Sequence, residues 1–160
     1  MIIKLENLPA LRELYKDKKI VLGSGVFDFL HYGHVLYLQS LADHGDITVA
    51  MVKSDARVRI GKGEQRPVLP EEDRALMVDA IKGVDFTFIA PHIDFIPGEI
   101  DPTYKSVLDS LKPDVFYSTN PVWKQLEQYC KNLKVVIGDR DTNKPRRSST
   151  EIIEHLKKLT

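Results

Sequence analysis

The sequence predicts a doubly wound α/β domain, in which a five-stranded parallel sheet carries helices on both faces. Five short apolar runs, each typical of a buried strand, alternate with segments whose apolar residues recur at helical spacing. The joints between these segments are short, which favours right-handed strand–helix–strand units. The chain has 160 residues, 42% of them hydrophobic, so residues 1–160 are expected to form a single domain with a substantial core.

The five predicted strands are short apolar segments, several of them rich in β-branched residues. They comprise residues 19–22, 47–52, 85–90, 114–118 and 133–137. In a doubly wound sheet, ligands bind beyond the carboxyl ends of the strands, near the point where the strand order reverses. A functional site is therefore expected at this edge of the sheet.

Three helices are predicted in the first half of the chain. The first, over residues 7–16, has leucines three apart and precedes the first strand. The second follows Gly33, with apolar residues at helical spacing as far as Ala42. The third opens at Pro70, where three carboxylates suit the positive end of a helix dipole, and stops at Gly83. Its expected buried residues are Leu76, Met77, Ala80 and Ile81.

Three more helices are predicted in the second half. In two of them an N-cap residue precedes a proline at the first helical position: Asp101 opens one helix, and Asn120 opens another that reaches Cys130. The last helix begins at Ser148 or Ser149, and a glutamate three residues after Ser148 completes a capping box. The residues expected to be buried on this helix are Ile152, Ile153, Leu156 and Leu159.

Residues 53–70 are predicted to be the longest irregular stretch. Glycines and prolines interrupt any regular pattern there, at Gly61, Gly63, Pro67 and Pro70. The same stretch carries positive charge from Arg57, Arg59, Lys62 and Arg66. Long loops in compact domains are often functional, so two interpretations are open, a ligand-binding loop and a solvated basic loop.

Composition excludes several classes of function. Lys and Arg number 23 and Asp and Glu also number 23, so no overall basic field favours nucleic acid. Cys130 is the only cysteine, which excludes intrachain disulfides and Cys-rich zinc sites and is typical of a reducing, cytoplasmic compartment. No apolar run approaches membrane-spanning length, so a soluble cytoplasmic protein that binds neither membrane nor nucleic acid is expected.

The segment that carries chemistry is residues 25–34, Gly-Val-Phe-Asp-Phe-Leu-His-Tyr-Gly-His, between the first strand and the second helix. Gly25 and Gly33 allow a ligand to approach the backbone closely, and the N–H groups that start a helix form an anion site. His31 and His34 lie three residues apart, so both imidazoles can donate hydrogen bonds to one phosphate. The segment therefore predicts a phosphate-binding site.

Two other kinds of site are conceivable for this segment. Asp28, His31 and His34 could together hold a metal ion, since carboxylate and imidazole are ordinary ligands, although no fourth ligand is evident. A dinucleotide fingerprint would need a glycine at the position of Asp28, so a nicotinamide site is not favoured.

Four further residues can be assigned structural roles. His44, His92 and His155 are interpreted as ordinary histidines with no role in the site, because nothing around them suggests a ligand. Trp123 is interpreted as a packing residue, with base stacking as the alternative.

Residues 25–34 closely resemble the H-x-G-H signature of the cytidylyltransferase-like nucleotidyltransferases, and the resemblance extends from about Lys19 to Leu159. Three stretches, residues 53–58, 62–68 and 71–74, are most similar to the adenylyltransferase domain for D-glycero-β-D-manno-heptose 1-phosphate. Glycerol-3-phosphate cytidylyltransferase and archaeal FAD synthetase are similar over the same segments. Residues 146–152 resemble the family's second signature, a Ser/Thr-rich turn that opens the last helix.

The resemblance implies a Rossmann-like fold and a nucleotidyl transfer. AMP or CMP would pass from a nucleoside triphosphate to a small phosphorylated acceptor such as heptose 1-phosphate, and pyrophosphate would leave. The phosphate nucleophile is already ionised, so positioning and charge stabilisation would dominate catalysis. Other readings are glycerol 3-phosphate or FMN as acceptor, a non-catalytic nucleotide-binding module, and a metal-dependent hydrolase.

The resemblance also assigns roles to residues. His31 and His34 would bind the reacting phosphates, and Lys62 and Arg74 would be charge clamps, although Arg74 could instead pair with a neighbouring carboxylate. The nucleotide-binding residues of the first signature are Gly25, Val26, Phe27, Asp28 and Gly33. Those of the second are Arg146, Ser148, Ser149 and Thr150, although Ser148 could act only as a helix cap. Mg²⁺ would accompany the triphosphate, and a homodimer is expected by analogy.

One segment departs from the family pattern. After the fourth strand the heptose enzymes have a Gly-rich stretch with Asp, where this chain has residues 117–123, Tyr-Ser-Thr-Asn-Pro-Val-Trp. That region usually helps to recognise the nucleotide base, so the sequence leaves both ATP and CTP open.

Overall fold

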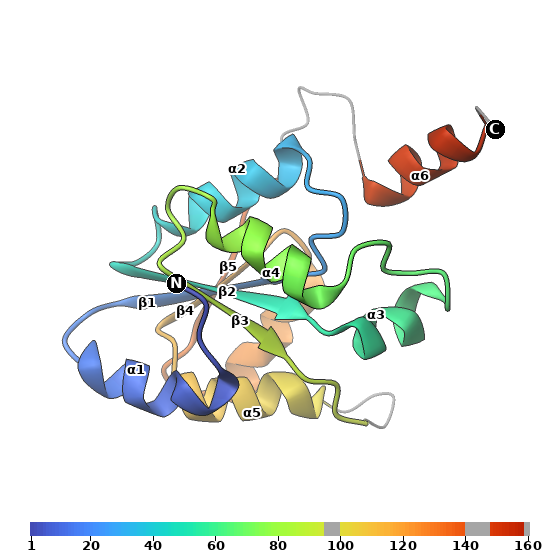
Figure 1. Cartoon of the computed structure of the whole chain (residues 1–160). Helices are drawn as coiled ribbons and strands as arrows, with labels where there is room; N and C mark the ends of the chain where they lie inside the picture. The colour runs from blue at the N-terminus through green and yellow to red at the C-terminus, as the bar shows by residue number, and fades with distance from the viewer. Residues whose placement is uncertain (95–99, 140–147, 159–160) are drawn as a thin grey trace.

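A computed structural model of the chain describes residues 1–94, 100–139 and 148–158. It contains the predicted five-stranded parallel sheet, with strand order β3-β2-β1-β4-β5 (Figure 1). The strands are β1 (Ile20–Gly25), β2 (Ile47–Lys53), β3 (Phe86–Ala90), β4 (Val115–Ser118) and β5 (Lys134–Ile137). The order reverses at β1, which pairs with β2 on one side and with β4 on the other.

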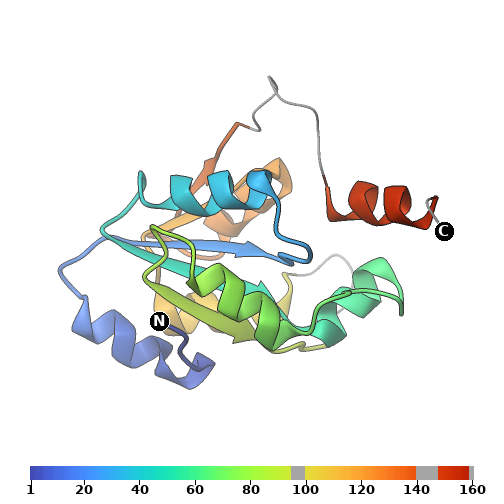
Figure 2. The same ribbon diagram turned by 45° about the horizontal axis from the view of Figure 1, so that its top comes forward.

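The helices follow the predicted alternation with the strands. They are η1 (Leu5–Asn7) and η2 (Pro121–Gln128), which are 3-10 helices, and α1 (Leu8–Leu14), α2 (Tyr32–Leu41), α3 (Asp55–Lys62), α4 (Glu71–Asp79), α5 (Pro102–Leu111) and α6 (Ser149–Lys157). In Figure 1, α1 and α5 lie below the sheet and α2 and α4 lie above it. In Figure 2, turned so that the top comes forward, α2 still lies above the strands and α4 crosses in front of β3. None of the described helices is long and apolar enough to cross a membrane.

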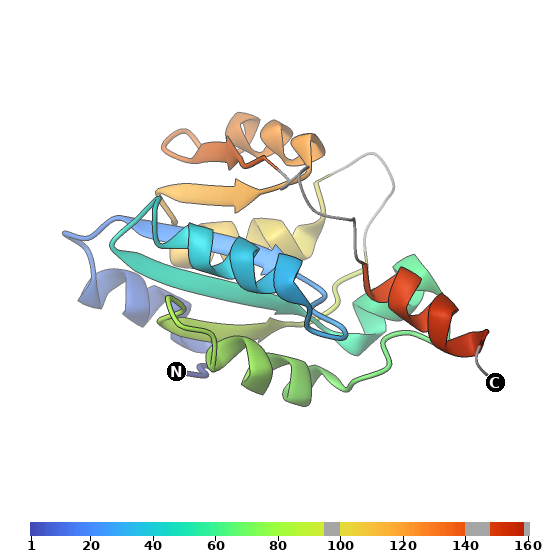
Figure 3. The same ribbon diagram turned by 90° about the horizontal axis from the view of Figure 1, so that it is seen from above.

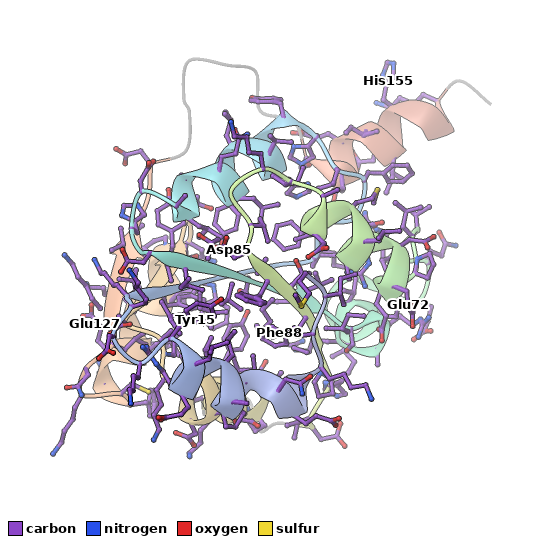
Figure 4. All side chains as sticks on the ribbon, turned by 60° about the vertical axis from the view of Figure 1, so that its left-hand side comes forward. Tyr15, Glu72, Asp85, Phe88, Glu127 and His155 are labelled. Carbon is purple, nitrogen blue, oxygen red and sulfur yellow. The ribbon has the colours of Figure 1, made fainter. Side chains whose placement is uncertain are left out.

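The alternation of side chains along β1 builds two hydrophobic clusters. Ile20 and Leu22 face α1, α5 and η2 in one cluster, which also holds Phe88, a side chain directed into the interior in Figure 4. Val21 faces α2 and α4 in the other cluster, with Leu38 from α2. Both faces of the sheet are therefore covered, which explains the continuous apolar runs of the predicted strands.

The prediction that residues 53–70 are irregular is wrong for their first half, which forms α3. Ser54 is the N-cap, because its hydroxyl accepts a hydrogen bond from the backbone N–H of Arg57 at 3.4 Å. Val58 is the only buried residue on this helix. Because only one side chain of α3 is buried, the sequence of this helix has no apolar repeat that would predict it.

The predicted buried face of α4 is also wrong in part. Leu76 is 63% exposed and Ala80 is exposed, whereas Ala75 and Val78 are buried together with Arg74. The face that meets the sheet thus contains a fully buried arginine, which a search for apolar periodicity excludes. Met77 and Ile81 are half-buried at the edge of this face.

Two helices in the second half differ from expectation. The segment after Asn120 is a 3-10 helix rather than an α-helix, and Leu126 is its only buried residue. On α6, Ile152 and Ile153 are half-buried rather than buried. Leu159 lies outside the described residues, and the side chain of Leu156 is not among those described. The 3-10 helix η2, with Leu126 as its buried side chain, connects β4 to its neighbour β5.

Candidate active site

The first signature forms the turn between β1 and α2, at the carboxyl edge where the strand order reverses. Gly25 ends β1, and a side chain there would collide with the folded-back ring of Phe27, because an added Cβ would lie 2.6 Å from the ring Cζ. Phe27 and Phe29 have φ values of 55° and 50°, a left-handed conformation that costs energy for non-glycine residues. The surrounding contacts must therefore hold the turn in place.

Asp28 supplies several of those contacts. Its carboxylate is 1% exposed and accepts hydrogen bonds from Arg66 Nε at 2.9 Å and from the backbone N–H groups of Val68 and Leu69 at 3.1 and 3.2 Å. Arg66 Nη2 lies 2.7 Å from the same carboxylate, and this residue is also buried. The two charges thus fasten the segment before α4 to the signature turn, and the Asp28 side chain faces protein rather than ligand.

The two histidines of the signature are stacked. Their ring centroids lie 3.9 Å apart, and the edge of Phe27 supports the ring of His34 at 5.5 Å. His31 is the N-cap of α2, and its Nδ1 accepts a hydrogen bond from Gly33 N at 3.2 Å. The neutral ring of His31 therefore carries its proton on Nε2, where it is available to a ligand.

Burial favours the neutral form of both rings. The pKa of His34 falls from 6.5 to about 4, mainly through burial and then through the positive charges of His31 and Lys62, while Asp28 acts against them. Burial also lowers the pKa of His31, and the nearby carboxylate of Glu151 opposes that shift. Near neutral pH the pair is uncharged, and a bound polyanion would favour its protonation.

Tyr37 is a positioning residue that the sequence motifs do not reveal. Its hydroxyl accepts a hydrogen bond from the N–H of Ser24 at 3.0 Å and donates one to the carbonyl of Tyr117 at 2.9 Å. It therefore joins α2 to the ends of both β1 and β4, beside the point where these strands diverge. The only sequence signal is its place on α2, three residues after His34.

Arg74 does not lie where the charge-clamp prediction needs it. The residue is 0% exposed, and its guanidinium donates to the backbone carbonyls of Leu69, Val26 and Lys53 and to the Asp55 carboxylate. These four bonds engage all three guanidinium nitrogens within the protein interior. In this structure Arg74 is a structural support of the signature turn, because Val26 belongs to that turn.

Lys62, the other predicted clamp, is exposed at the end of α3. Its ammonium acts electrostatically on His34, which places it near the stacked pair. Partial loss of hydration and the charge of Arg66 lower the pKa of Lys62, and Asp28 opposes this shift. Among the described residues it forms no ion pair, so its charge is available to a ligand.

The start of α6 lies beside the first signature, and Figure 3 shows this helix beyond the carboxyl ends of the central strands. The hydroxyl of Ser149 donates to the backbone carbonyl of Asp28, and Ser149 is buried. Ser148 and Glu151 form the predicted capping box, with hydrogen bonds of 2.8 and 3.2 Å. Thr150 is exposed, and Arg146 lies outside the described residues.

The metal-site alternative finds no support in the described parts of the chain. No group of three His, Cys, Asp or Glu side chains that could hold a metal ion occurs among those residues. The carboxylate of Asp28, which that alternative requires, is already paired with Arg66.

In the segment that departs from the family pattern, the two aromatic ends pack inward, while Val122 between them is exposed. The ring of Trp123 lies 4.3 Å from that of Tyr104 and 5.8 Å from that of Phe116, measured between centroids, as its interpretation as a packing residue predicts. Tyr117 stacks on His44 at 4.8 Å. A side chain at Gly138 would meet the Tyr117 hydroxyl at 1.9 Å, so the backbone after β5 closes over this tyrosine.

The remaining histidines agree with their structural interpretation. Nε2 of His92 lies 2.9 Å from a carboxylate oxygen of Asp94, and His155 projects away from the rest of the molecule on α6 (Figure 4).

Comparison with known proteins gives one family and several relatives. Residues 22–155 match the model of the family described as cytidylyltransferase-like. Proteins named Bifunctional protein HldE are similar to the chain: that of Geobacter metallireducens is 43% identical over 91 residues, which are 54% of this chain and 19% of the relative. That of Citrifermentans bemidjiense is 37% identical over 117 residues, 70% of this chain and 22% of the relative. The chain therefore spans about a fifth of the length of these relatives.

Two solved structures illustrate the likeness of fold. The lipopolysaccharide core biosynthesis protein from Thermoplasma volcanium has a TM-score of 0.60 and 27% identity, covering 78% of this chain and 99% of that one. A pantoate-beta-alanine ligase from Francisella tularensis has a TM-score of 0.66 over 94% of this chain and 69% of that one, but only 14% identity, so it indicates the fold alone.

Proposed function

The chain belongs to the cytidylyltransferase-like family of nucleotidyltransferases, and from this premise we propose that it transfers AMP or CMP from a nucleoside triphosphate to a small phosphorylated acceptor. The acceptor's phosphate oxygen attacks the α-phosphorus, a new P–O bond forms, and the bond to the β-phosphate breaks. Pyrophosphate leaves with the electron pair of that bond. No proton needs to be removed from the nucleophile, so a general base is not required.

The observation that carries the proposal is the stacked pair of His31 and His34 at the start of α2. Negative charge grows on the α-phosphate oxygens and on the leaving pyrophosphate during the transfer. The Nε2 proton of His31 and the N–H groups that open α2 are fixed donors for that charge. Because both rings start neutral, the approach of the triphosphate itself would favour protonation and strengthen the hydrogen bonds.

The other signature residues complete the triphosphate site. We assign the backbone of Gly25 through Phe27 to the nucleotide, and Lys62 to the phosphates, as an exposed cation near His34. Ser148, Thr150 and the start of α6 are assigned to the β- and γ-phosphates. Ser149 supports this arrangement by its bond to the Asp28 carbonyl.

Mg²⁺ is proposed as the counterion of the triphosphate. Mg²⁺ usually retains several waters and binds through substrate phosphates, and a bound ion would neutralise charge on the leaving pyrophosphate. The carboxylate of the first signature, Asp28, is paired with Arg66, which fits an ion that arrives with the nucleotide rather than one held by a protein cluster. Lys62 and the histidines then hold the phosphate oxygens that remain uncovered.

Heptose 1-phosphate is the proposed acceptor. Its support is the similarity to proteins named HldE, together with residues 53–58, 62–68 and 71–74, which resemble the heptose 1-phosphate adenylyltransferase domain. No feature of the described residues favours glycerol 3-phosphate or FMN. We also propose, by analogy with the family, that the protein is a cytoplasmic homodimer that binds neither membrane nor nucleic acid. Sedimentation of the purified protein would test the number of subunits.

A pyrophosphate-release screen tests the proposal. Four nucleoside triphosphates are crossed with heptose 1-phosphate, glycerol 3-phosphate, phosphocholine, phosphoethanolamine and FMN, all with Mg²⁺. We expect release with heptose 1-phosphate and one triphosphate, ATP or CTP. Binding of a triphosphate without release across the whole panel would instead identify a non-catalytic nucleotide-binding module.

A further inference from the structure

A second cationic position lies at the same edge of the sheet. Lys53 is the last residue of β2, and its ammonium lies 5.7 Å from the ring centroids of both Tyr104 and Trp123. These are cation–π contacts with two aromatic faces. In the described part of the chain, no carboxylate lies within ion-pair distance of Lys53, and the residue is half-buried.

The surroundings of Lys53 are held by specific bonds. The Tyr104 hydroxyl is hydrogen-bonded to Ser24 Oγ on β1 at 2.8 Å, and Tyr104 is 2% exposed. Arg57 on α3 pairs with Asp101, the N-cap of α5, at 3.2 Å. Asp101 is thus engaged by Arg57, and among the described side chains the Lys53 ammonium contacts aromatic rings alone. Four elements of the fold, β1, β2, α3 and α5, together with Trp123 of η2, build this position.

Lys53 lies on the opposite face of the sheet from the histidine pair. Tyr104 and Trp123 belong to the hydrophobic cluster under α1, α5 and η2. Phe27, which supports His34, belongs to the cluster under α2 and α4. The carboxyl end of β1 therefore lies between the two positions.

The surroundings of the Lys53 ammonium favour the binding of an anion. Burial lowers the pKa of its ammonium, Arg57 and Lys62 lower it further, and Asp101 only partly opposes them. Aromatic faces stabilise a cation less than a charged partner does. A bound anion would therefore stabilise the charged form. Of the ligand parts in the proposed reaction, base and ribose are uncharged and the triphosphate already meets two helix starts and Lys62, which leaves the phosphate of the acceptor.

We propose that Lys53, framed by Tyr104 and Trp123, binds the phosphate group of the acceptor and selects for phosphorylated acceptors. This inference rests on the proposed nucleotidyl transfer. Lys53 then brings the nucleophilic phosphate to β1 from the α5 side, while the triphosphate is bound on the α2 side, an arrangement suited to in-line attack.

Trp123 provides a direct test, because it is the only tryptophan in the chain. A phosphate at Lys53 changes the field on the indole ring and hence its fluorescence. We expect a saturable change in emission when heptose 1-phosphate is added without nucleotide, and none with unphosphorylated heptose. In Lys53→Met the dissociation constant should rise by about ten- to a hundredfold, the scale of a lost charge-assisted hydrogen bond. Thermal unfolding of Lys53→Met verifies that the variant is folded.

Lys105→Met is the matched control, since Lys105 is an exposed lysine of α5 whose ion pair with Asp109 lies on the surface. It should bind heptose 1-phosphate as the wild type does. Equal affinity of Lys53→Met and the wild type, or an equal fluorescence response to heptose, would overturn the inference.

Steady-state kinetics separates this inference from the proposed function. If the wild type releases pyrophosphate, Lys53→Met should raise KM for the acceptor by about ten- to a hundredfold and change KM for the triphosphate less than about threefold. Turnover with an unchanged acceptor KM would contradict the role of Lys53 and leave the transferase function intact. Fluorescence binding that depends on Lys53, without turnover in any combination, would contradict the function and retain the phosphate site.

Discussion

The guanidinium of Arg74, on α4, donates a hydrogen bond to the backbone carbonyl of Val26, in the turn that leads to the two histidines. The same guanidinium reaches the end of β2 through the carbonyl of Lys53 at 2.9 Å. One buried cation thus holds the starts of two loops that belong to different strands. The geometry of the site depends on this residue even though it touches no ligand in the proposed arrangement.

Replacing Arg74 should therefore affect stability first. Arg74→Met removes four hydrogen bonds and leaves the carboxylate of Asp55 without its buried partner, so we expect the free energy of unfolding to fall by about 3–5 kcal/mol. Chemical denaturation measures this change. Arg59→Met is the control, because Arg59 is exposed and lies 3.9 Å from the same Asp55, and its effect should stay within about 0.5 kcal/mol. Wild-type stability with lost turnover in Arg74→Met would restore the charge-clamp interpretation.

The stacked histidines should control turnover. His31→Ala and His34→Ala each remove an imidazole that faces the growing charge, and we expect kcat for pyrophosphate release to fall at least about a hundredfold. His155→Ala, at an exposed position on α6, should leave kcat unchanged. If both signature variants keep near-wild-type turnover, the histidines are not part of the chemistry.

The low pKa of His34 should make stability depend on pH. The ring has a pKa of about 4 when folded and 6.5 as its ordinary value, so the unfolded chain binds more protons between these values. Stability from this group is complete above pH 6.5 and is lost as the pH falls towards 4, by on the order of 3 kcal/mol. The free energy of unfolding, measured at intervals across this pH window, should vary less with pH for His34→Gln than for the wild type. Identical pH profiles in variant and wild type would mean that the ring is not buried in its neutral form.

Asp28 should act through the segment that it holds. Asp28→Asn removes the charge that faces Arg66 and weakens the bonds to Val68 and Leu69, so a loss of about 2 kcal/mol in the free energy of unfolding is expected. Limited proteolysis should then cut the segment before α4 more readily. Asp43→Asn, an exposed aspartate, should change neither measurement. The prediction fails if Asp28→Asn is as stable and as protease-resistant as Asp43→Asn.

The sequence predicted the sheet well because buried parallel strands leave continuous apolar runs, and all five strands lie within a few residues of their expected ranges. It missed α3 because that helix buries only Val58 and has no apolar repeat. The inward face of α4 was misjudged for a related reason. Arg74 can be buried because it donates hydrogen bonds to segments that lie far from it in the chain, and no local sequence pattern predicts such bonds.

The first signature was recognisable because its chemistry is local: two glycines and two histidines share ten residues. Its supports were not recognisable. In the sequence Tyr37 resembles any other helical tyrosine. Its role becomes clear only in the fold, where its hydroxyl is hydrogen-bonded to the ends of both β1 and β4. Lys53 is an ordinary strand-end lysine until α5 and η2 bring aromatic rings to it. Residues that act through long-range contacts become visible only in the folded chain.

The hydrogen bond from Ser149 to the Asp28 carbonyl joins residues 121 positions apart. During synthesis the first turn therefore emerges from the ribosome long before its partner on α6 exists. The partners of the Asp28 side chain, residues 66–69, lie only about forty positions further along the chain. The pairing of Asp28 with Arg66 therefore needs only the first 66 residues, whereas the contact that joins the signature turn to α6 needs nearly the whole sequence described here.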